Sequence, residues 1–290
     1  MPLLLRSLLF ALLAVRAATS CAGSVPIDEI GCTTEALFAQ GFEDDAPCYV
    51  PDSSKGTGGD ATSGDHTGTV YVASLGVTRE YAWRIPSGFD PEKPAALLVA
   101  LHGSSGNVKL AATTLRNNWG LVVESEGVIV LTPHGTGSGG GWRGNDADTI
   151  AAAVAQLEAQ YPIDRRRRYL WGYSAGAHFG HSVVLDDPTP WAAYGVSAGA
   201  LTQYACGVPG APSCNAWLAT ASSTNRLPVS ITIGTQDPLY PYASGDPARF
   251  ESAGWAAPEL RYVEFAGGHA YHLPHLVDTW AYLGRYAQAR

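Results

Sequence analysis

The chain has 290 residues, of which 46% are hydrophobic and 15% charged, so it can build a large core and we expect no extensive disorder. The formal net charge of −8 argues against a general nucleic-acid-binding protein, because few cations are available to neutralise phosphates. The one basic run, residues 165–168, predicts a solvated turn before a strand.

Residues 1–20 predict a signal peptide. Arg6 precedes an apolar stretch at 7–15 that is too short to span a bilayer, and the small residues Ala18 and Ser20 precede a cleavage site. We therefore expect an exported protein, which is secreted, periplasmic or held at the cell envelope, and in which disulfides can form.

The five cysteines leave one without an obvious partner. Cys32 and Cys48 flank one small loop and Cys206 and Cys214 another, so we expect these two pairs as disulfides. Cys21 remains, directly after the predicted cleavage site, where the acylated cysteine of a bacterial lipoprotein stands. Two interpretations stay open: lipid attachment of Cys21 to a membrane, or a free or differently paired thiol.

Residues 21–68 are poorly periodic and rich in small polar residues towards their end, which predicts a tether or a loop-rich segment. From residue 69 to 290, short apolar runs alternate with helical patterns, which is typical of an α/β fold with a mostly parallel sheet and helices on both faces. The expected strands are 69–75, 79–86, 95–103, 127–133, 168–172, 191–198, 228–235 and 260–267. The expected helices are 107–118, 146–161, 174–185 and 276–287.

The pattern Gly-x-Ser-x-Gly, which is typical of an exposed nucleophilic serine, occurs around Ser174 and again around Ser197. Such a serine needs a strand before it, a helix after it and glycines that permit a sharp turn. Ser174 meets all three conditions. Beyond Ser197, glycine and proline at 207–212 prevent a long helix, so we interpret Ser197 as a packed residue of a buried strand.

Counting strands predicts the partners of Ser174. In the α/β-hydrolase order the nucleophile follows the fifth strand, an acid follows the seventh and a histidine follows the last. Asp237 and His269 stand at the latter two positions, so they complete a predicted Ser-His-Asp triad. Alternatives are Asp246, Glu251 and Asp278 for the acid and His272 for the base.

His269, His272 and His275 together raise the alternative of a metal site. Pro274 interrupts the regular helix that such a spacing often uses, and Gly267 and Gly268 let the loop bend back over Ser174. We therefore favour a base over a ligand, and expect neither a metal nor an organic cofactor.

Two backbone N–H groups are expected to bind the oxyanion of the intermediate, those of Ala175 and of Ser104 in the loop "HGSSGN". We expect His102, Trp142 and Trp217 to contact the substrate. Trp217 lies in the excursion 198–228 between two strands, where a lid is often inserted in this fold.

From about residue 69 to 286 the chain resembles secreted esterases of the poly(3-hydroxybutyrate) depolymerase and feruloyl esterase group. The matching stretches are "LHG", "GWR", "YPIDRRRRYLWGYSAG", "GTQDPLYPY" and "GGH". The resemblance implies carboxylic ester hydrolysis, with Ser174, Asp237 and His269 as the triad. The chain lacks the cysteine that many members carry after "HG", and has "GHAYHLP" for the usual Gly-His-x-Trp-Pro, so the substrate stays open.

We therefore predict an exported, monomeric serine hydrolase that cleaves feruloyl, acetyl or short hydroxyalkanoate esters through an acyl-enzyme. Its expected partner is a small or polymeric ester rather than nucleic acid. Two alternatives stay open: a serine peptidase or amidase on the same fold, and a catalytically silent surface-binding protein.

Overall fold

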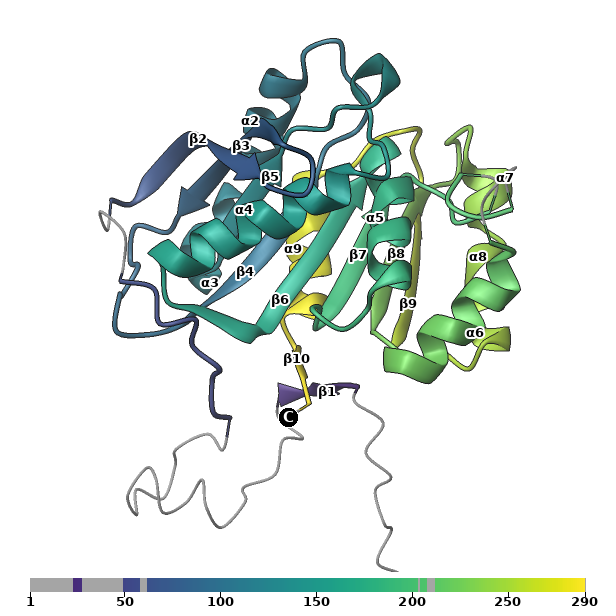
Figure 1. The fold of residues 1–290 in the computed structure, drawn as a ribbon. Helices are drawn as coiled ribbons and strands as arrows, with labels where there is room; N and C mark the ends of the chain where they lie inside the picture. Colours follow the sequence, from purple (N-terminus) through teal and green to yellow (C-terminus); the bar gives the residue numbers. More distant parts are fainter. Residues whose placement is uncertain (1–22, 28–48, 58–61, 203, 208–211, 290) are drawn as a thin grey trace, which may run out of the picture.

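The computed structural model describes residues 23–27, 49–57, 62–202, 204–207 and 212–289. Eight of their strands form one sheet in the order β2-β3-β5-β4-β6-β7-β8-β9, which is antiparallel from β2 to β5 and parallel from there on (Figure 1). The strands are β2 (Gly64–Val72), β3 (Val77–Ile85), β4 (Ala95–Leu101), β5 (Ile129–Pro133), β6 (Ile163–Tyr173), β7 (Ala193–Ser197), β8 (Val229–Gly234) and β9 (Leu260–Phe265).

Helices cover both faces of the sheet, because successive strand residues point to opposite sides and both sides of the central strands are apolar (Figure 1). In β4, Leu97 and Val99 belong to the core under α4 and α5, whereas Leu98 and Ala100 belong to the core under α2, α3 and α9. The helices are α2 (Val108–Asn118), α3 (Gly120–Glu126), α4 (Asp146–Gln160), α5 (Ala175–Asp186), α6 (Cys214–Asn225), α7 (Tyr240–Ala243), α8 (Asp246–Ser252) and α9 (Leu273–Leu283).

The predicted α/β class, with an eight-stranded mostly parallel sheet, is confirmed, and the differences concern element ends. β2 begins at Gly64, before the expected boundary at 69. Its first residues alternate between partly buried and exposed, so they form no apolar run from which the strand could be predicted. The stretch 276–287, expected as one helix, is α9 followed by a short strand, β10 (Tyr286–Gln288). The excursion 198–228 holds α6, whose side chains Leu218 and Ala221 are buried in the main core.

The basic run is not a solvated turn, contrary to the sequence-based interpretation, because it forms part of the long strand β6. Arg166 is buried and its guanidinium donates to the backbone oxygens of Val50 and Gln288, while lying over the ring of Tyr49. Tyr49 in turn donates its hydroxyl to Asp164. Described residues before the predicted catalytic domain are therefore attached to the start of β6.

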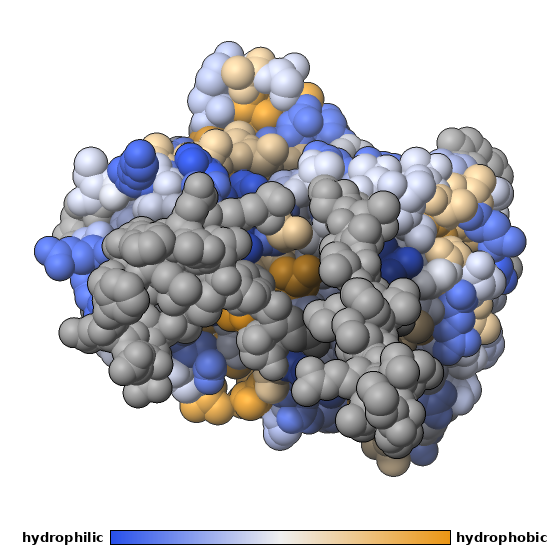
Figure 2. All heavy atoms as spheres, turned by 90° about the horizontal axis from the view of Figure 1, so that it is seen from below, coloured by the Kyte–Doolittle hydropathy of each residue, from blue (hydrophilic) through white to orange (hydrophobic). Residues whose placement is uncertain are grey.

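The two described ends of the chain meet at the amino-terminal end of the parallel strands. The strand β1 (Ser24–Pro26) pairs antiparallel with β10, and the N–H of Ala289 donates to the carbonyl of Gly23. This pair lies below the sheet in Figure 1, whereas the loops after the parallel strands lie at the upper edge. Figure 2 shows the lower end, where the visible surface is mainly hydrophilic with small hydrophobic patches. None of the described helices is long and apolar enough to cross a membrane.

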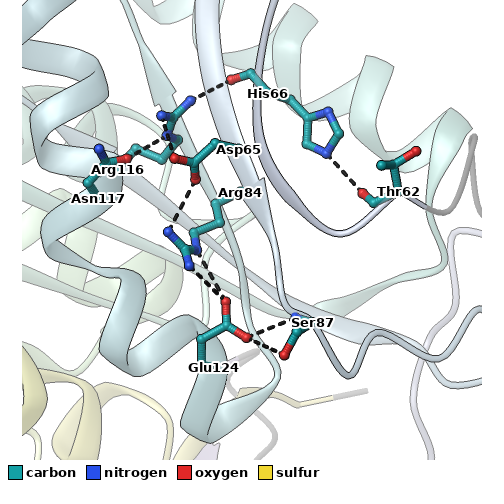
Figure 3. Close-up of polar contacts among 8 residues, drawn as sticks. All are labelled: Thr62, Asp65, His66, Arg84, Ser87, Arg116, Asn117 and Glu124. Carbon is teal, nitrogen blue, oxygen red and sulfur yellow. Dashed lines mark hydrogen bonds and ion pairs between the residues drawn. The ribbon is translucent and has the colours of Figure 1, made fainter.

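Ion pairs fasten the opening strands to the helices beside them (Figure 3). Asp65 of β2 accepts from Arg84 of β3 at 3.2 Å and from Arg116 of α2 at 2.8 Å. Arg84 also donates to Glu124 of α3, which accepts two further hydrogen bonds from Ser87. Because Arg116 is nearly buried, this network contributes more to the stability of the fold than an exposed ion pair would. It holds the antiparallel edge in place and takes no part in the site described below.

Candidate active site

Ser174 stands at a sharp turn between β6 and α5. Its backbone has φ 53° and ψ −118°, an unusual conformation for a residue with a side chain, and α5 begins at the next residue. A Cβ at Gly172 would lie 2.2 Å from the carbonyl oxygen of Gly176, and one at Gly176 would lie 2.3 Å from that of Leu101. Both positions therefore require glycine, and the geometry is that of a nucleophile elbow.

Three side chains from three different loops form one hydrogen-bonded chain. His269, which follows β9, has Nε2 2.8 Å from the hydroxyl oxygen of Ser174. Its Nδ1 lies 2.9 Å and 3.1 Å from the two carboxylate oxygens of Asp237, which follows β8. These distances suit a tautomer that donates from Nδ1 to the carboxylate and accepts from Ser174 at Nε2.

The loops that carry the acid and the histidine are themselves fixed. The side chain of Asp237 is fully buried, and one of its oxygens also accepts from the N–H of Leu239 at 2.8 Å. A Cβ at Gly234 would lie 2.3 Å from the carbonyl oxygen of Gly267, so glycine lets the two loops approach. The imidazole of His269 is about one third exposed, so a substrate can reach it while the carboxylate stays dry.

The alternatives for the acid and the base lie elsewhere. His272 is exposed at the start of α9, where its ring contacts Phe265 and His275. Asp246 is buried and accepts from the N–H of Leu201. Glu251 and Asp278 are exposed on α8 and α9. Within the described residues, no group of three or more His, Cys, Asp or Glu side chains is arranged to hold a metal ion.

The expected oxyanion donors lie next to the elbow. A Cβ at Gly103 would be 3.2 Å from the Cβ of Ser174, so the loop after β4 passes directly beside the predicted nucleophile. A Cβ at Gly141 would contact both the hydroxyl of Ser104 at 3.2 Å and the Cβ of Ala175 at 3.7 Å. The side chains of Ser104 and Ala175 therefore both lie beside Gly141, next to the elbow.

Of the three predicted substrate contacts, Trp217 lies away from the site. It is buried in the core on α6, and its indole N–H donates to Asp186 at the end of α5. Since Ser174 directly precedes α5, the far end of this helix is about 18 Å from it along the helix axis. The prediction of a substrate contact did not take into account that α6 packs into the core.

The disulfide Cys206–Cys214, in contrast, is present as expected. Residues Cys21, Cys32 and Cys48 lie outside the described residues.

His102 and Trp142 lie beside the site but are held by the protein. His102 is 2% exposed, and both of its ring nitrogens have backbone partners. Trp142 is partly buried between the rings of His102 and Phe179. Burial lowers the pKa of His102, which keeps its imidazole neutral. A substrate contact through these side chains is thus restricted, although His102 borders a pocket.

That pocket, about 270 Å³ in volume, opens beside Ser104. Its aromatic wall is Tyr173 and Tyr271, whose rings meet edge to face at 4.7 Å, and its other wall is the face of α2 that carries Leu110 and Thr114. The hydroxyl of Tyr173 donates to the carbonyl of His269 at 3.0 Å. These lining residues were not predicted from the sequence, although Tyr173 directly precedes Ser174 and Tyr271 lies two residues after His269.

A second aromatic group follows the elbow on its other side. His178, one turn into α5, accepts from the N–H of Ala200 at Nδ1 and stacks on Tyr204 with ring centroids 4.3 Å apart. Tyr204 is 45% exposed and contacts Tyr242 edge to face. Burial lowers the pKa of His178, so this imidazole acts as a neutral hydrogen-bonding group.

The fold is an α/β-hydrolase fold, as the strand order, the elbow and the positions of the three side chains show. Similar proteins have the same fold. No family model matches the chain. Feruloyl esterase C of Emericella nidulans is 30% identical over 129 residues, which cover 42% of this chain and 47% of that enzyme. The chain thus spans about half the length of this relative.

Solved structures extend the likeness over most of the fold. A ferulic acid esterase superimposes with a TM-score of 0.59 at 17% identity, over 77% of this chain and 98% of that one. FphF, a fluorophosphonate-binding serine hydrolase of Staphylococcus aureus, has a TM-score of 0.60 at 15% identity, over the same two fractions. At these low sequence identities, the structural similarity shows only that the fold is shared.

Proposed function

We propose that the protein is a serine esterase that cleaves carboxylic esters through a covalent acyl-enzyme. The observation that carries the proposal is the hydrogen-bonded chain from Ser174 through His269 to the buried Asp237, at the carboxyl edge of the parallel sheet. The partial identity to a feruloyl esterase and the esterases among proteins of the same fold support it.

In the first half of the reaction, the oxygen of Ser174 attacks the ester carbonyl carbon while its proton passes to Nε2 of His269. Asp237 accepts from Nδ1 throughout and stabilises the imidazolium that forms. The N–H groups of Ser104 and Ala175 bind the oxyanion. When the tetrahedral intermediate collapses, His269 donates the proton to the leaving alcohol and the acyl group stays on Ser174.

In the second half, water attacks the acyl-enzyme and gives its proton to His269, which returns it to Ser174 as the acid is released. The partial exposure of His269 fits this step, because the water must reach Nε2 after the alcohol has left.

For the substrate, we propose esters with a feruloyl, acetyl or short hydroxyalkanoate acyl group. The similarity to a feruloyl esterase favours the first of these. The pocket walled by Tyr173 and Tyr271 also favours it, because edge-to-face contacts suit a planar ring. A pocket of about 270 Å³ is large enough for such a group.

The test is a panel of p-nitrophenyl esters of increasing acyl length, together with methyl ferulate and a polyester film. We expect turnover of short acyl esters and of methyl ferulate, and none in the variant Ser174→Ala. A fluorophosphonate probe should label the wild type at Ser174. Substantial residual turnover in Ser174→Ala would exclude Ser174 as the nucleophile.

The same panel separates the alternatives. A peptidase or amidase would cleave p-nitroanilides of the same acyl groups at a rate comparable with the esters. A silent binding protein would neither turn over any substrate nor react with the probe.

For localisation, we propose export, which the predicted signal peptide and the disulfide Cys206–Cys214 support. We further propose that Cys21 is acylated. The β1–β10 pair, close in sequence to Cys21, lies at the end of the molecule opposite the loop between β6 and α5 that carries Ser174, so an anchor on that side leaves the site facing away from the membrane. Mass spectrometry of the mature N-terminal peptide tests this: an unmodified Cys21 in the membrane fraction excludes it.

A further inference from the structure

The geometry points to His102 and Trp142 as positioning residues that fix the oxyanion loop, in place of the substrate contacts expected from the sequence. The inference rests on the proposed function, because it assigns to the Ser104 N–H the role of oxyanion donor. It arises from three hydrogen bonds, each of which holds one of three successive peptide groups between His102 and Ser105.

The first peptide group joins His102 to Gly103. Its carbonyl oxygen accepts a hydrogen bond of 2.8 Å from the indole N–H of Trp142. The indole ring is fixed in turn, because it lies between the ring of His102 at 4.8 Å and the ring of Phe179 at 5.2 Å, nearly parallel to the latter. Trp142 thus holds the loop at the point where it leaves β4.

The second peptide group joins Gly103 to Ser104 and carries the N–H that matters. Its carbonyl oxygen lies 2.7 Å from Nδ1 of His102, which donates to it. Because a peptide is planar and trans, its C=O and N–H point in opposite directions, so holding the Gly103 oxygen aims the Ser104 N–H. Gly103 has no side chain of its own to restrict this plane, so the imidazole supplies the restriction.

His102 can donate at Nδ1 and accept at Nε2 at the same time only as one neutral tautomer. Its Nε2 accepts from the N–H of Gly135 at 3.1 Å, so the ring is neutral with its proton on Nδ1. An imidazolium would have no acceptor for Gly135. The side chain therefore connects the oxyanion loop to the loop that begins at Gly135, and both contacts are backbone contacts.

The third peptide group joins Ser104 to Ser105. The N–H of Ser105 donates to the carbonyl of Gly140 at 3.3 Å. Gly140 has φ 67°, and a Cβ there would lie 1.8 Å from the carbonyl oxygen of Ser105, so only glycine permits this approach. The loop that holds Trp142 therefore contacts the oxyanion loop at a second place.

A buried carboxylate shapes this second loop. Asp146, the first residue of α4, is 1% exposed and accepts from the N–H groups of Thr136 and Arg143 and from the hydroxyl of Thr136. These bonds close the loop at both ends, which places Trp142 and Gly140 against the oxyanion loop. Asp146 thus supports the position of Ser104 without touching the substrate.

The test compares Trp142→Phe with Trp255→Phe in the full chain. The first substitution keeps an aromatic ring between His102 and Phe179 and removes the N–H that holds the His102 carbonyl. The second removes another indole N–H that donates to a backbone carbonyl, that of Leu227, from a fully buried ring. We measure kcat and KM for a p-nitrophenyl ester, together with the thermal unfolding midpoint of each variant.

A positioning role predicts that Trp142→Phe lowers kcat by about 10-fold to 100-fold and changes KM by less than about threefold, because a loosened donor is lost mainly in the transition state. Trp255→Phe should lower the unfolding midpoint by a similar amount and leave kcat within about twofold. Equal kcat values for the two variants would overturn the inference.

If Trp142→Phe does not fold, Asp146→Asn weakens the same loop from its other end, and an unchanged kcat in this folded variant is an equally negative result. The two proposals also separate. If the wild type turns over no ester but Ser174 reacts with a fluorophosphonate, the esterase proposal fails, and the labelling rates of the variants still test the oxyanion loop. If Ser174 does not react at all, both fail.

Discussion

Ser174 directly follows β6 and Ser197 ends the neighbouring parallel strand β7, and each lies between glycines at the same spacing. At Ser174 the backbone turns at once, with φ 53°, and a helix of twelve residues begins at the next position. At Ser197 the strand simply ends, the side chain is 2% exposed, and the positive φ falls one residue later, at Ala198. The same five-residue pattern therefore gives a partly exposed serine in one place and a buried one in the other.

The segment around Ser197 helps to hold the elbow at Ser174 in place. The carbonyl of Ser197 accepts from the N–H of Ser174 at 3.0 Å, and a Cβ at Gly199 would lie 2.3 Å from the Cβ of Ala177 on α5. The small residues after Ser197 thus let the first turn of α5 approach β7. The glycines at 172 and 176 serve the turn of the chain, whereas Gly199 serves helix packing.

The largest difference between the two copies should appear in catalysis. Ser174→Ala should lower kcat by about 10⁶-fold, since no other hydroxyl can take the place of the nucleophile. Ser197→Ala should leave kcat within about twofold and change the free energy of unfolding by less than about 1 kcal/mol, because the buried hydroxyl has no hydrogen-bond partner among the described residues. Steady-state kinetics with a p-nitrophenyl ester and urea unfolding measure both. A large kcat loss in Ser197→Ala would contradict the distinction.

The acid of the triad gives the next largest effect. Asp237→Asn should lower kcat by about 10⁴-fold, because an amide cannot hold His269 in the tautomer that accepts from Ser174. Asp278→Asn, which changes an exposed carboxylate on α9, is the matched control and should leave kcat unchanged. Equal effects of the two substitutions on kcat would show that Asp237 does not act on His269.

The sequence predicts the relation of Ser174, Asp237 and His269 because each follows a strand of a parallel sheet, and the carboxyl ends of such strands meet at one edge. Strand order alone therefore brings residues 95 positions apart in the chain within hydrogen-bond distance. No knowledge of side-chain packing is needed for this step.

Packing decides the features that the sequence did not predict. Trp217 lies on α6, whose alternation of small and polar residues gives no clear apolar face, so its burial could not be anticipated. The roles of Trp142 and His102 depend on hydrogen bonds between two irregular loops, and no periodicity encodes these. Arg166 is buried because residues before the main domain cover it, which local sequence cannot show.

Acid should lower the free energy of unfolding through His181, a buried residue of the helix that follows Ser174. His181 on α5 is fully buried, and burial lowers its pKa to about 3, from 6.5 in the unfolded chain. The unfolded state therefore binds the proton first, and stability present above pH 6.5 is lost as the pH falls towards 3. Between pH 7 and pH 5 this amounts to about 2 kcal/mol.

Unfolding by urea across this pH range measures the slope, and His181→Phe should remove the contribution. Tyr194→Phe is the matched control, since it deletes the hydroxyl 3.3 Å from the imidazole but keeps the buried histidine, and it should keep the slope. Identical slopes in the wild type and in His181→Phe would show that His181 does not titrate on unfolding.

Asp246, in the region after Ser197, should change the stability of the protein in the opposite direction as the pH falls, and by a smaller amount. Asp246 is buried, and burial raises its pKa to about 6, above the value of 3.8 in the unfolded chain, even though Leu201 and Thr202 donate to it. The folded state now binds the proton more tightly, so the stability that is present at low pH is lost as the pH rises through 6. Between pH 5 and pH 7 the loss is about 1 kcal/mol.

Asp246→Asn should remove this loss and so make the overall loss of stability in acid steeper, because the opposing contribution of His181 is then no longer offset. Thr202→Val, which deletes one donor and keeps the carboxylate, should preserve the behaviour of the wild type. Both are measured as the free energy of unfolding in urea at pH 5 and pH 7. A shallower pH dependence in Asp246→Asn would mean that the carboxylate is held ionised by its neighbours, and that the two serine regions do not differ in the sign of their response to acid.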